Sequence, residues 1–213
     1  MPYSYILFDL DGTLTDSGPG IMNAAAHALK LRGIVDQTPE QLRRFVGPPL
    51  SDAFPMFYGI TDVDEAIRQF REYYWPIGLY ENDPYPGIAD CLAALRRRGK
   101  KLAVATSKPL QMAEIVLDRF DLRQYFDVVC GATLDEKRNH KPEIVADALD
   151  ALGVTDKADA LMVGDRAQDV RGARLNGIAC AGVLWGYGSR EELESAGADY
   201  VVEDQAQLLD VCG

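Results

Sequence analysis

The hydrophobic residues of this chain form short continuous runs that alternate with longer segments of helical spacing. Six such runs predict strands at 5–10, 101–106, 127–131, 160–163, 178–184 and 199–201. Most of them lack the polar alternation of a half-exposed strand, which indicates burial on both faces. Segments with apolar residues three or four apart predict helices at 87–98, 109–119, 142–152, 169–176 and 204–211. This alternation predicts an α/β fold, a Rossmann-like parallel sheet core with helices on both faces.

The segment 17–85 interrupts the alternation, because it contains no convincing strand. Its apolar spacing predicts helices near 17–32, 39–46, 49–58 and 62–78. We interpret 17–85 as a small all-helical domain inserted after the first strand, which leaves 1–16 and 86–213 as the core. The Pro- and Gly-rich segments at its two ends, 18–20 and 83–87, are expected to act as hinges.

Net charge, cysteine spacing and the N-terminal residues restrict the classes of binding partner and the cellular location that we expect. A formal net charge of −11 over 213 residues argues against nucleic acid and anionic membranes. The four cysteines lack the spacing of a zinc site or a disulfide framework, which favours reduced thiols in a cytoplasmic protein. The N-terminal apolar run is interrupted by Asp9, and we find no signal peptide or membrane-spanning segment in the sequence.

Two aspartates, Asp9 and Asp11, directly follow the first predicted strand in the stretch FDLDGTLTDS. Neighbouring carboxylates at a buried strand end repel each other, so a cation is expected to hold their charge. Asp165 and Asp169 follow the strand predicted at 160–163, and the carboxyl ends of parallel strands meet at one edge of a sheet. A few hard oxygen ligands with room for water indicate Mg²⁺.

Groups suited to a phosphoryl group follow two other predicted strands. Thr106 and Ser107 offer hydroxyls and backbone N–H groups at the start of a helix, and Lys141 precedes Pro142 at the start of the next. This combination indicates phosphoryl transfer. Each feature also has a structural alternative: a turn at Asp11-Gly12, a helix cap at Thr106, or a first-turn acid at Asp169.

Four motifs carry a resemblance to the haloacid dehalogenase-like hydrolase superfamily. They are DLDGTLTDS from Asp9, the strand ending at Thr106, Lys141-Pro142, and Gly164-Asp165 with Asp169, in the expected order along nearly the whole chain. The helical insert resembles the cap domain of that superfamily. The match is closest to phosphoglycolate-phosphatase-like and nucleotidase-like members, judged by the stretches TSKP at 106–109, GPPL at 47–50 and GYGS at 186–189.

The resemblance implies a role for each motif residue. Asp9 would attack phosphorus and form an aspartyl-phosphate, and Asp11 would protonate the leaving oxygen and then activate water. Mg²⁺ would be bound by the Asp9 side chain, the Asp11 backbone carbonyl and the Asp165 side chain. Asp169 would orient metal-bound water or Lys141. The phosphoryl oxygens would be held by a wider set: Thr106, Ser107, Lys141, Gly12 and Thr13.

The expected activity is Mg²⁺-dependent hydrolysis of a small phosphorylated metabolite, such as phosphoglycolate or a nucleoside monophosphate. A phosphomutase of the same fold and a non-enzymatic binding module remain alternatives, and monomer and homodimer are both compatible with the sequence. The presence of Asp11 argues against dehalogenation, which needs no acid for a leaving oxygen. The candidates for substrate choice are Arg43, Arg44 and Gly47 of the insert and Arg166 beside Asp165. For the three residues of the insert, a solvated helix face followed by a tight turn is an equal alternative.

Overall fold

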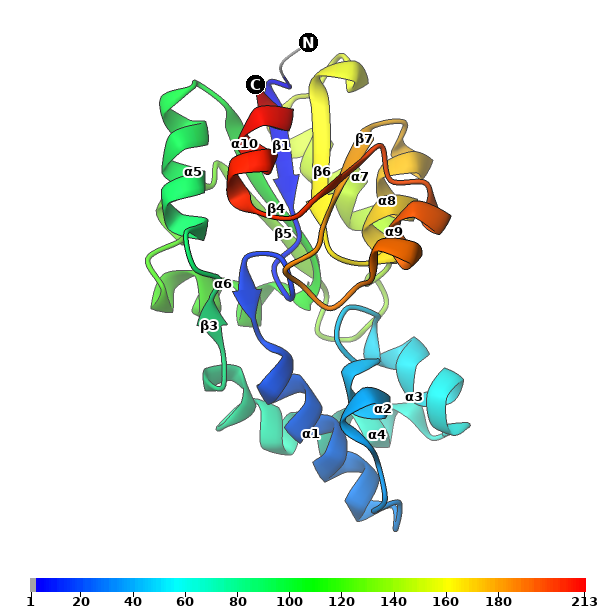
Figure 1. The fold of residues 1–213 in the computed structure, drawn as a ribbon. Helices are drawn as coiled ribbons and strands as arrows, with labels where there is room; N and C mark the ends of the chain where they lie inside the picture. Colours follow the sequence, from blue (N-terminus) through cyan, green and yellow to red (C-terminus); the bar gives the residue numbers. More distant parts are fainter. Residues whose placement is uncertain (1–2) are drawn as a thin grey trace.

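The computed structural model describes residues 3–213 and contains a six-stranded sheet in the order β5-β4-β1-β6-β7-β8 (Figure 1). All five strand pairs are parallel. The strands are β1 (Tyr5–Phe8), β4 (Lys101–Pro109), β5 (Val128–Ala132), β6 (Ala160–Gly164), β7 (Ala179–Val183) and β8 (Tyr200–Val202). Each of the six predicted strands is therefore present, with small shifts at its ends.

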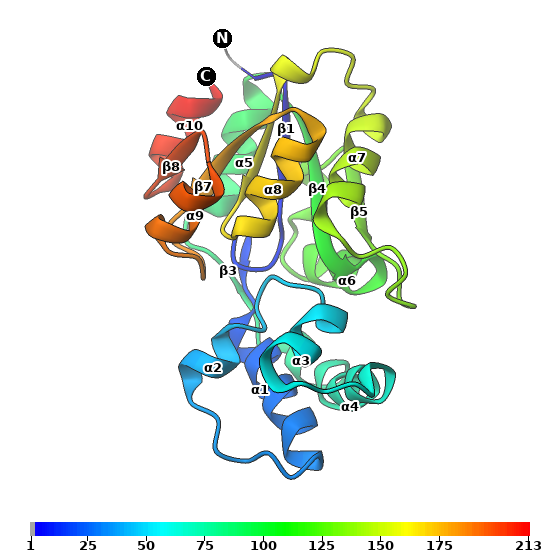
Figure 2. The same cartoon turned by 90° about the vertical axis from the view of Figure 1, so that its right-hand side faces the viewer.

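Helices cover both faces of the sheet (Figure 2). Successive side chains of β1 alternate between the faces: Ile6 and Phe8 join one apolar cluster and Leu7 the other. The Leu7 face packs against α7 (Lys141–Leu152), α8 (Ala167–Asn176) and α9 (Arg190–Ala196). The Phe8 face packs against α5 (Ile88–Arg97), α6 (Leu110–Arg119) and α10 (Gln205–Cys212). This layering confirms the predicted α/β class, because buried parallel strands need apolar cover on both sides.

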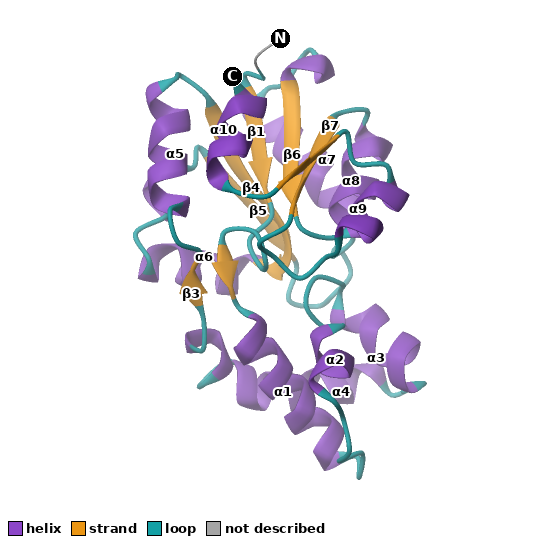
Figure 3. Cartoon of the chain, viewed as in Figure 1, coloured by secondary structure: helices purple, strands orange, loops and turns teal. Residues whose placement is uncertain are grey.

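The remaining helices lie beyond the carboxyl edge of the sheet, away from both chain ends (Figures 1 and 3). They are α1 (Gly18–Leu31), α2 (Pro39–Arg43), α3 (Leu50–Tyr58), α4 (Val63–Tyr74) and a 3₁₀ turn at Gly78–Tyr80. Two short strands, β2 (Thr15–Asp16) and β3 (Asp83–Pro84), pair antiparallel where the chain enters and leaves this helical segment. Among the described residues, no helix is long and apolar enough to cross a membrane.

Several boundaries differ from the sequence-based prediction. The helix predicted at 62–78 ends at Tyr74, because Pro76 has no backbone N–H with which to continue the helical hydrogen bonds. Helix α9 was not predicted, since Leu193 is its only buried residue and gives no apolar period. The expectation that 17–85 contains no strand was wrong at β3. This two-residue strand pairs with β2, and the local pattern of hydrophobic residues does not predict that pairing.

The segment 18–20 is not a loop between domains, because it forms the first turn of α1. A Cβ added to Gly20 would lie 1.9 Å from the Gly78 carbonyl oxygen, and one added to Gly18 would lie 1.8 Å from the Tyr187 hydroxyl. Both glycines are therefore required by close packing rather than by backbone flexibility. The paired strands β2 and β3 are the connection between the sheet and the helical segment.

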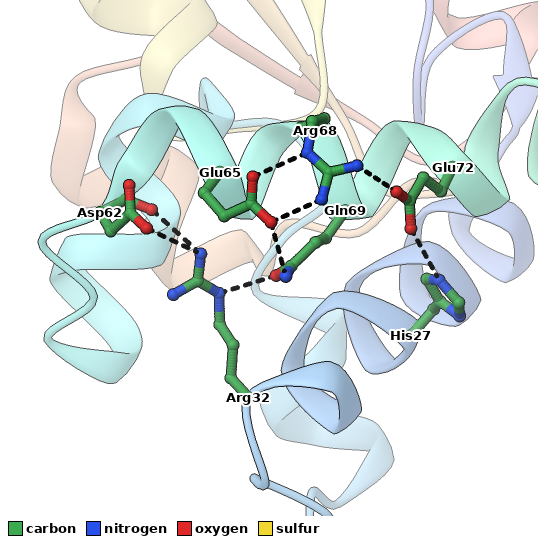
Figure 4. Close-up of polar contacts among 7 residues, drawn as sticks. All are labelled: His27, Arg32, Asp62, Glu65, Arg68, Gln69 and Glu72. Carbon is green, nitrogen blue, oxygen red and sulfur yellow. Dashed lines mark hydrogen bonds and ion pairs between the residues drawn. The ribbon is translucent and has the colours of Figure 1, made fainter.

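Helix α4 is strongly amphipathic, and its two faces have different tasks. Ile67, Phe70 and Tyr74 are buried, whereas Arg68 and Glu72 are exposed. The outer face carries a polar network with α1 (Figure 4), which includes Arg68 with Glu65 and Glu72, His27 with Glu72, and Arg32 with Gln69 and Asp62. Exposed ion pairs contribute little to stability, so it is the burial of the apolar face that sets the orientation of α4 about its own axis.

Candidate active site

The predicted carboxylates lie together at the carboxyl edge of the sheet. Asp9 follows β1 and Asp165 follows β6, its direct neighbour. Asp169 lies in the first turn of α8, where its carboxylate accepts a hydrogen bond from the Arg166 backbone N–H at 3.0 Å. Carboxylate oxygens of Asp9, Asp165 and Asp169 all lie within 4.8 Å of one another. All three side chains are buried, so their charges are poorly screened by water.

Lys141 neutralises part of this charge. Its Nζ lies 2.8 Å from Asp9 Oδ1 and 2.9 Å from Asp169 Oδ1, and it donates a hydrogen bond to the Ala105 carbonyl oxygen at 3.1 Å. Burial opposes its positive charge, but the two carboxylates raise the pKa of Lys141 above its usual range. The residue is therefore a permanent cation at the first position of α7.

A second buried lysine, Lys108, binds Asp11. Lys108 Nζ donates to both carboxylate oxygens of Asp11, at 2.7 and 2.9 Å, and to the Tyr74 hydroxyl oxygen at 2.6 Å. Burial opposes the charge of Lys108, whereas Asp11 and Tyr74 raise its pKa. Because Tyr74 belongs to α4, this network connects the helical segment directly to the sheet edge. No pattern in the sequence indicated a role for the side chain of Lys108 or for Tyr74.

The buried carboxyl groups and lysines at the sheet edge have a balance of charge that suits a bound divalent cation. Four buried carboxyl groups, on Asp9, Asp11, Asp165 and Asp169, face two buried lysines, so full ionisation of the four would leave two negative charges without a counter-charge. Burial, followed by the charges of Asp169 and Asp9, raises the pKa of Asp165 to about 8. The cluster offers only hard oxygen donors, which suits Mg²⁺. Asp169 takes part in this grouping, while the Asp11 carboxylate is turned to Lys108.

Loops on either side hold Asp165 in place. It accepts hydrogen bonds from the Tyr187 backbone N–H at 2.7 Å and from the Thr13 hydroxyl at 3.3 Å. A Cβ on Gly12 would lie 2.4 Å from the Asp165 carboxylate, and Gly12 has a φ of +83°, which disfavours any other residue. Gly12 therefore allows the loop after β1 to pass close to Asp165, and the hydroxyl of Thr13 binds the Asp165 carboxylate.

Thr106 and Ser107 lie at the end of β4, where the register with β5 shifts between Thr106 and Pro109. The Thr106 hydroxyl accepts a hydrogen bond from the Lys108 backbone N–H at 3.2 Å. This irregularity points successive polar groups toward the sheet edge rather than to alternate faces. Thr106 and Ser107 line the same cavity as Asp9 and Asp11.

That cavity has a volume of about 60 Å³ and lies between the sheet edge and the helical segment. Its walls are mostly apolar and aromatic, with Ile21, Phe45, Leu50, Phe70 and Met112. Arg71 of α4 and Glu136 of the β5–α7 loop complete the lining as a pair of opposite charges. This volume is well below the roughly 300 Å³ of sites for drug-sized ligands.

The residues assigned to substrate choice have different positions. Gly47 lines the cavity, whereas Arg43, Arg44 and Arg166 are not among its lining residues. Arg43 donates hydrogen bonds to the carbonyl oxygens of residues 186 and 187, and Arg44 stacks on the ring of Phe57. Arg166 binds Glu192 at 2.9 Å and donates to the Val46 carbonyl oxygen, so it contacts the loop that contains Gly47.

Comparison with known proteins identifies relatives along the whole chain. The family model described as haloacid dehalogenase-like hydrolase matches residues 6–183. A 5'-nucleotidase from Pseudomonas aeruginosa is 41% identical over 98% of this chain and 95% of its own length. A tyrosine-protein kinase PtkA from Mycobacterium tuberculosis is 37% identical over 92% of this chain and 67% of its own. A phosphoglycolate phosphatase from Aquifex aeolicus is 32% identical, with coverages of 96% and 94%.

The fold is shared with a solved structure. The crystal structure of a predicted phosphatase from Clostridium acetobutylicum superposes with a TM-score of 0.95, at 40% identity and with coverage of 99% of this chain and 98% of that chain. The family match spans β1 through β7 and includes every motif residue from Asp9 to Asp169. Both predicted branches, nucleotidase-like and phosphoglycolate-phosphatase-like, occur among the relatives. The chain belongs to the haloacid dehalogenase-like hydrolase family.

Proposed function

We propose that this protein is a Mg²⁺-dependent phosphatase of small phosphorylated metabolites. The observation that carries the proposal is the position of Asp9, which lines the cavity and belongs to the buried carboxylate cluster with Asp165 and Asp169. Its carboxylate is fixed by Lys141 at 2.8 Å. A bound Mg²⁺ would offset the repulsion between Asp9 and a phosphate anion and polarise the phosphoryl oxygens.

The chain's own residues have distinct tasks in this proposal. Asp9 attacks phosphorus, the bond from phosphorus to the leaving oxygen breaks, and that oxygen takes the proton that Asp11 carries into this step. Asp11 then accepts a proton from the water that attacks phosphorus, which breaks the bond to Asp9 and releases phosphate. Lys141 and the hydroxyls of Thr106 and Ser107 hold the phosphoryl oxygens, together with the backbone N–H groups of residues 12 and 13. Residues 17–85 act as a cap domain over the core formed by 1–16 and 86–213, and closure excludes water.

As substrate we propose a nucleoside 5'-monophosphate rather than phosphoglycolate. The 5'-nucleotidase relative and the aromatic cavity wall, formed by Phe45, Phe70 and Tyr74, support this choice. A nucleoside is larger than the cavity, so in this proposal the cap opens to admit it. Four free thiols support a cytoplasmic location for the reaction.

The test is phosphate release from a panel of substrates with Mg²⁺. The panel contains p-nitrophenyl phosphate, nucleoside 5'-monophosphates, phosphoglycolate, pyrophosphate and glucose 1-phosphate. We expect the highest kcat/KM for a nucleoside monophosphate, loss of turnover in EDTA, and at least a thousandfold loss of kcat in Asp9→Asn. Asp90→Asn, an exposed aspartate of α5, is the matched control and keeps full activity. Glucose 6-phosphate in place of free phosphate would instead indicate a phosphomutase.

A further inference from the structure

The cap and the core meet at a charged pair inside the cavity. Arg71 Nη2 of α4 lies 2.8 Å from Glu136 Oε1, and the two side chains are only 22% and 15% exposed. Both residues line the cavity that contains Asp9 and Asp11. Neither residue belongs to a motif that the proposed chemistry uses, so their place in the cavity wall calls for another role.

Glu136 is fixed in place from both sides. Its second oxygen, Oε2, accepts a hydrogen bond from Asn139 Nδ2 at 3.0 Å, and Asn139 also donates to the Ser51 hydroxyl of α3 at 2.8 Å. Asn139 is buried. The backbone of Glu136 has a φ of +59°, a conformation that residues other than glycine rarely adopt. The loop therefore presents this one carboxylate to the cavity at the expense of local backbone strain.

Among the described residues that line the cavity, no cation is left free to pair with an anionic group. The cations nearest the site are already paired: Lys108 with Asp11, Lys141 with Asp9 and Asp169, and Arg71 with Glu136. Every other described residue in the lining is uncharged. A carboxylate or second phosphate on the leaving group would lie beside Glu136 in a poorly hydrated wall, which is unfavourable. Hydroxyl groups would meet an acceptor in Glu136 and donors in Arg71.

We propose that the Arg71–Glu136 pair selects a neutral, hydroxyl-bearing leaving group and excludes anionic leaving groups. This inference rests on the proposed phosphatase function and makes its substrate preference specific. Nucleosides belong to the accepted class, because they combine a flat apolar face with sugar hydroxyls. Phosphoglycolate and pyrophosphate belong to the excluded class, because each keeps a negative charge on the leaving group.

The test compares kcat/KM for adenosine 5'-monophosphate and phosphoglycolate in four proteins, with p-nitrophenyl phosphate as the common reference. Glu136→Gln frees the Arg71 charge, so the phosphoglycolate-to-nucleotide ratio should rise by roughly tenfold relative to wild type. Arg71→Gln leaves Glu136 uncompensated, so the same ratio should fall. Asp135→Asn removes one charge from the exposed neighbouring position and should leave the ratio within about twofold.

The two variants move the ratio in opposite directions, which a general loss of folding would not do. An unchanged ratio in both variants, or a fall in Glu136→Gln, would overturn the inference while the phosphatase function stands. Absence of turnover on p-nitrophenyl phosphate in the wild-type protein would instead overturn the proposed function. A wild-type preference for phosphoglycolate over the nucleotide would overturn the selection rule and the proposed nucleotide substrate, while the phosphatase activity itself would stand.

Discussion

Removal of one hydroxyl, in Tyr74→Phe, tests the connection between cap and core. The Tyr74 hydroxyl oxygen accepts a hydrogen bond from Lys108 Nζ at 2.6 Å, and Lys108 holds both oxygens of Asp11. Tyr74, Lys108 and Asp11 are 2%, 6% and 8% exposed, so water does not readily replace a lost partner. The substitution leaves the ring and its packing on Phe70 in place.

The magnitude follows from the kind of bond that is lost. A hydrogen bond to a buried charged group contributes about 1.5–3 kcal/mol, so Tyr74→Phe should lower the free energy of unfolding by that amount. Lys108→Met removes the cation beside Asp11 and should cost about 3–5 kcal/mol, because a buried carboxylate loses its partner. If Tyr74 acts through Lys108, the double variant should be less destabilised than the sum of the single variants by about 1.5–3 kcal/mol.

Urea unfolding of the wild type, both single variants and the double variant measures this coupling at pH 7. Tyr80→Phe is the control, because Tyr80 is 47% exposed and its substitution should change stability by less than about 0.5 kcal/mol. Additive effects of Tyr74→Phe and Lys108→Met would refute the reasoning. Such a result would mean that the two residues stabilise the protein independently and that the cap is not held through Lys108.

Two further predictions concern packing and charge. Gly20→Ala should lower the unfolding free energy by about 1–3 kcal/mol, because the new Cβ would lie 1.9 Å from the Gly78 carbonyl oxygen; an unchanged melting temperature would contradict this contact. In the folded protein without metal, burial raises the pKa of Asp165 to about 8, whereas in the unfolded chain this pKa is near its usual value. The folded state therefore binds the proton more tightly between these values, and stability should fall as pH rises from about 4 to 8. Mg²⁺ should accordingly raise the melting temperature more at pH 8 than at pH 5, and an equal shift at both pH values would be evidence against the cation site.

The sheet and the motif residues were predictable from sequence because their signals are local. Buried parallel strands appear as apolar runs, and Asp9, Thr106 and Asp165 each follow such a run directly. Parallel topology then brings the strand ends to one edge, whatever the details of the loops. The helical character of 17–85 was predictable for the same reason, from its apolar spacing and breaker residues.

The contacts between cap and core were not predictable, because they join residues distant in sequence. In the sequence, Lys108 is only one residue of the stretch TSKP, and the packing of α4 brings Tyr74 to it. Arg71 and Glu136 are separated by 65 positions, and no local pattern relates them. Arg43 and Arg44 looked like cavity residues, but α2 ends at Arg43 and their side chains contact Tyr187 and Phe57.

The central claim is that Asp9 accepts the phosphoryl group. Rapid acid quenching of the enzyme during turnover, followed by mass spectrometry of the peptide that contains Asp9, tests it most directly. We predict a phosphate group on Asp9 in the wild type and none in Asp9→Asn, which should also lose turnover. Steady turnover in Asp9→Asn, or a phosphate group found on another residue instead, would contradict the account.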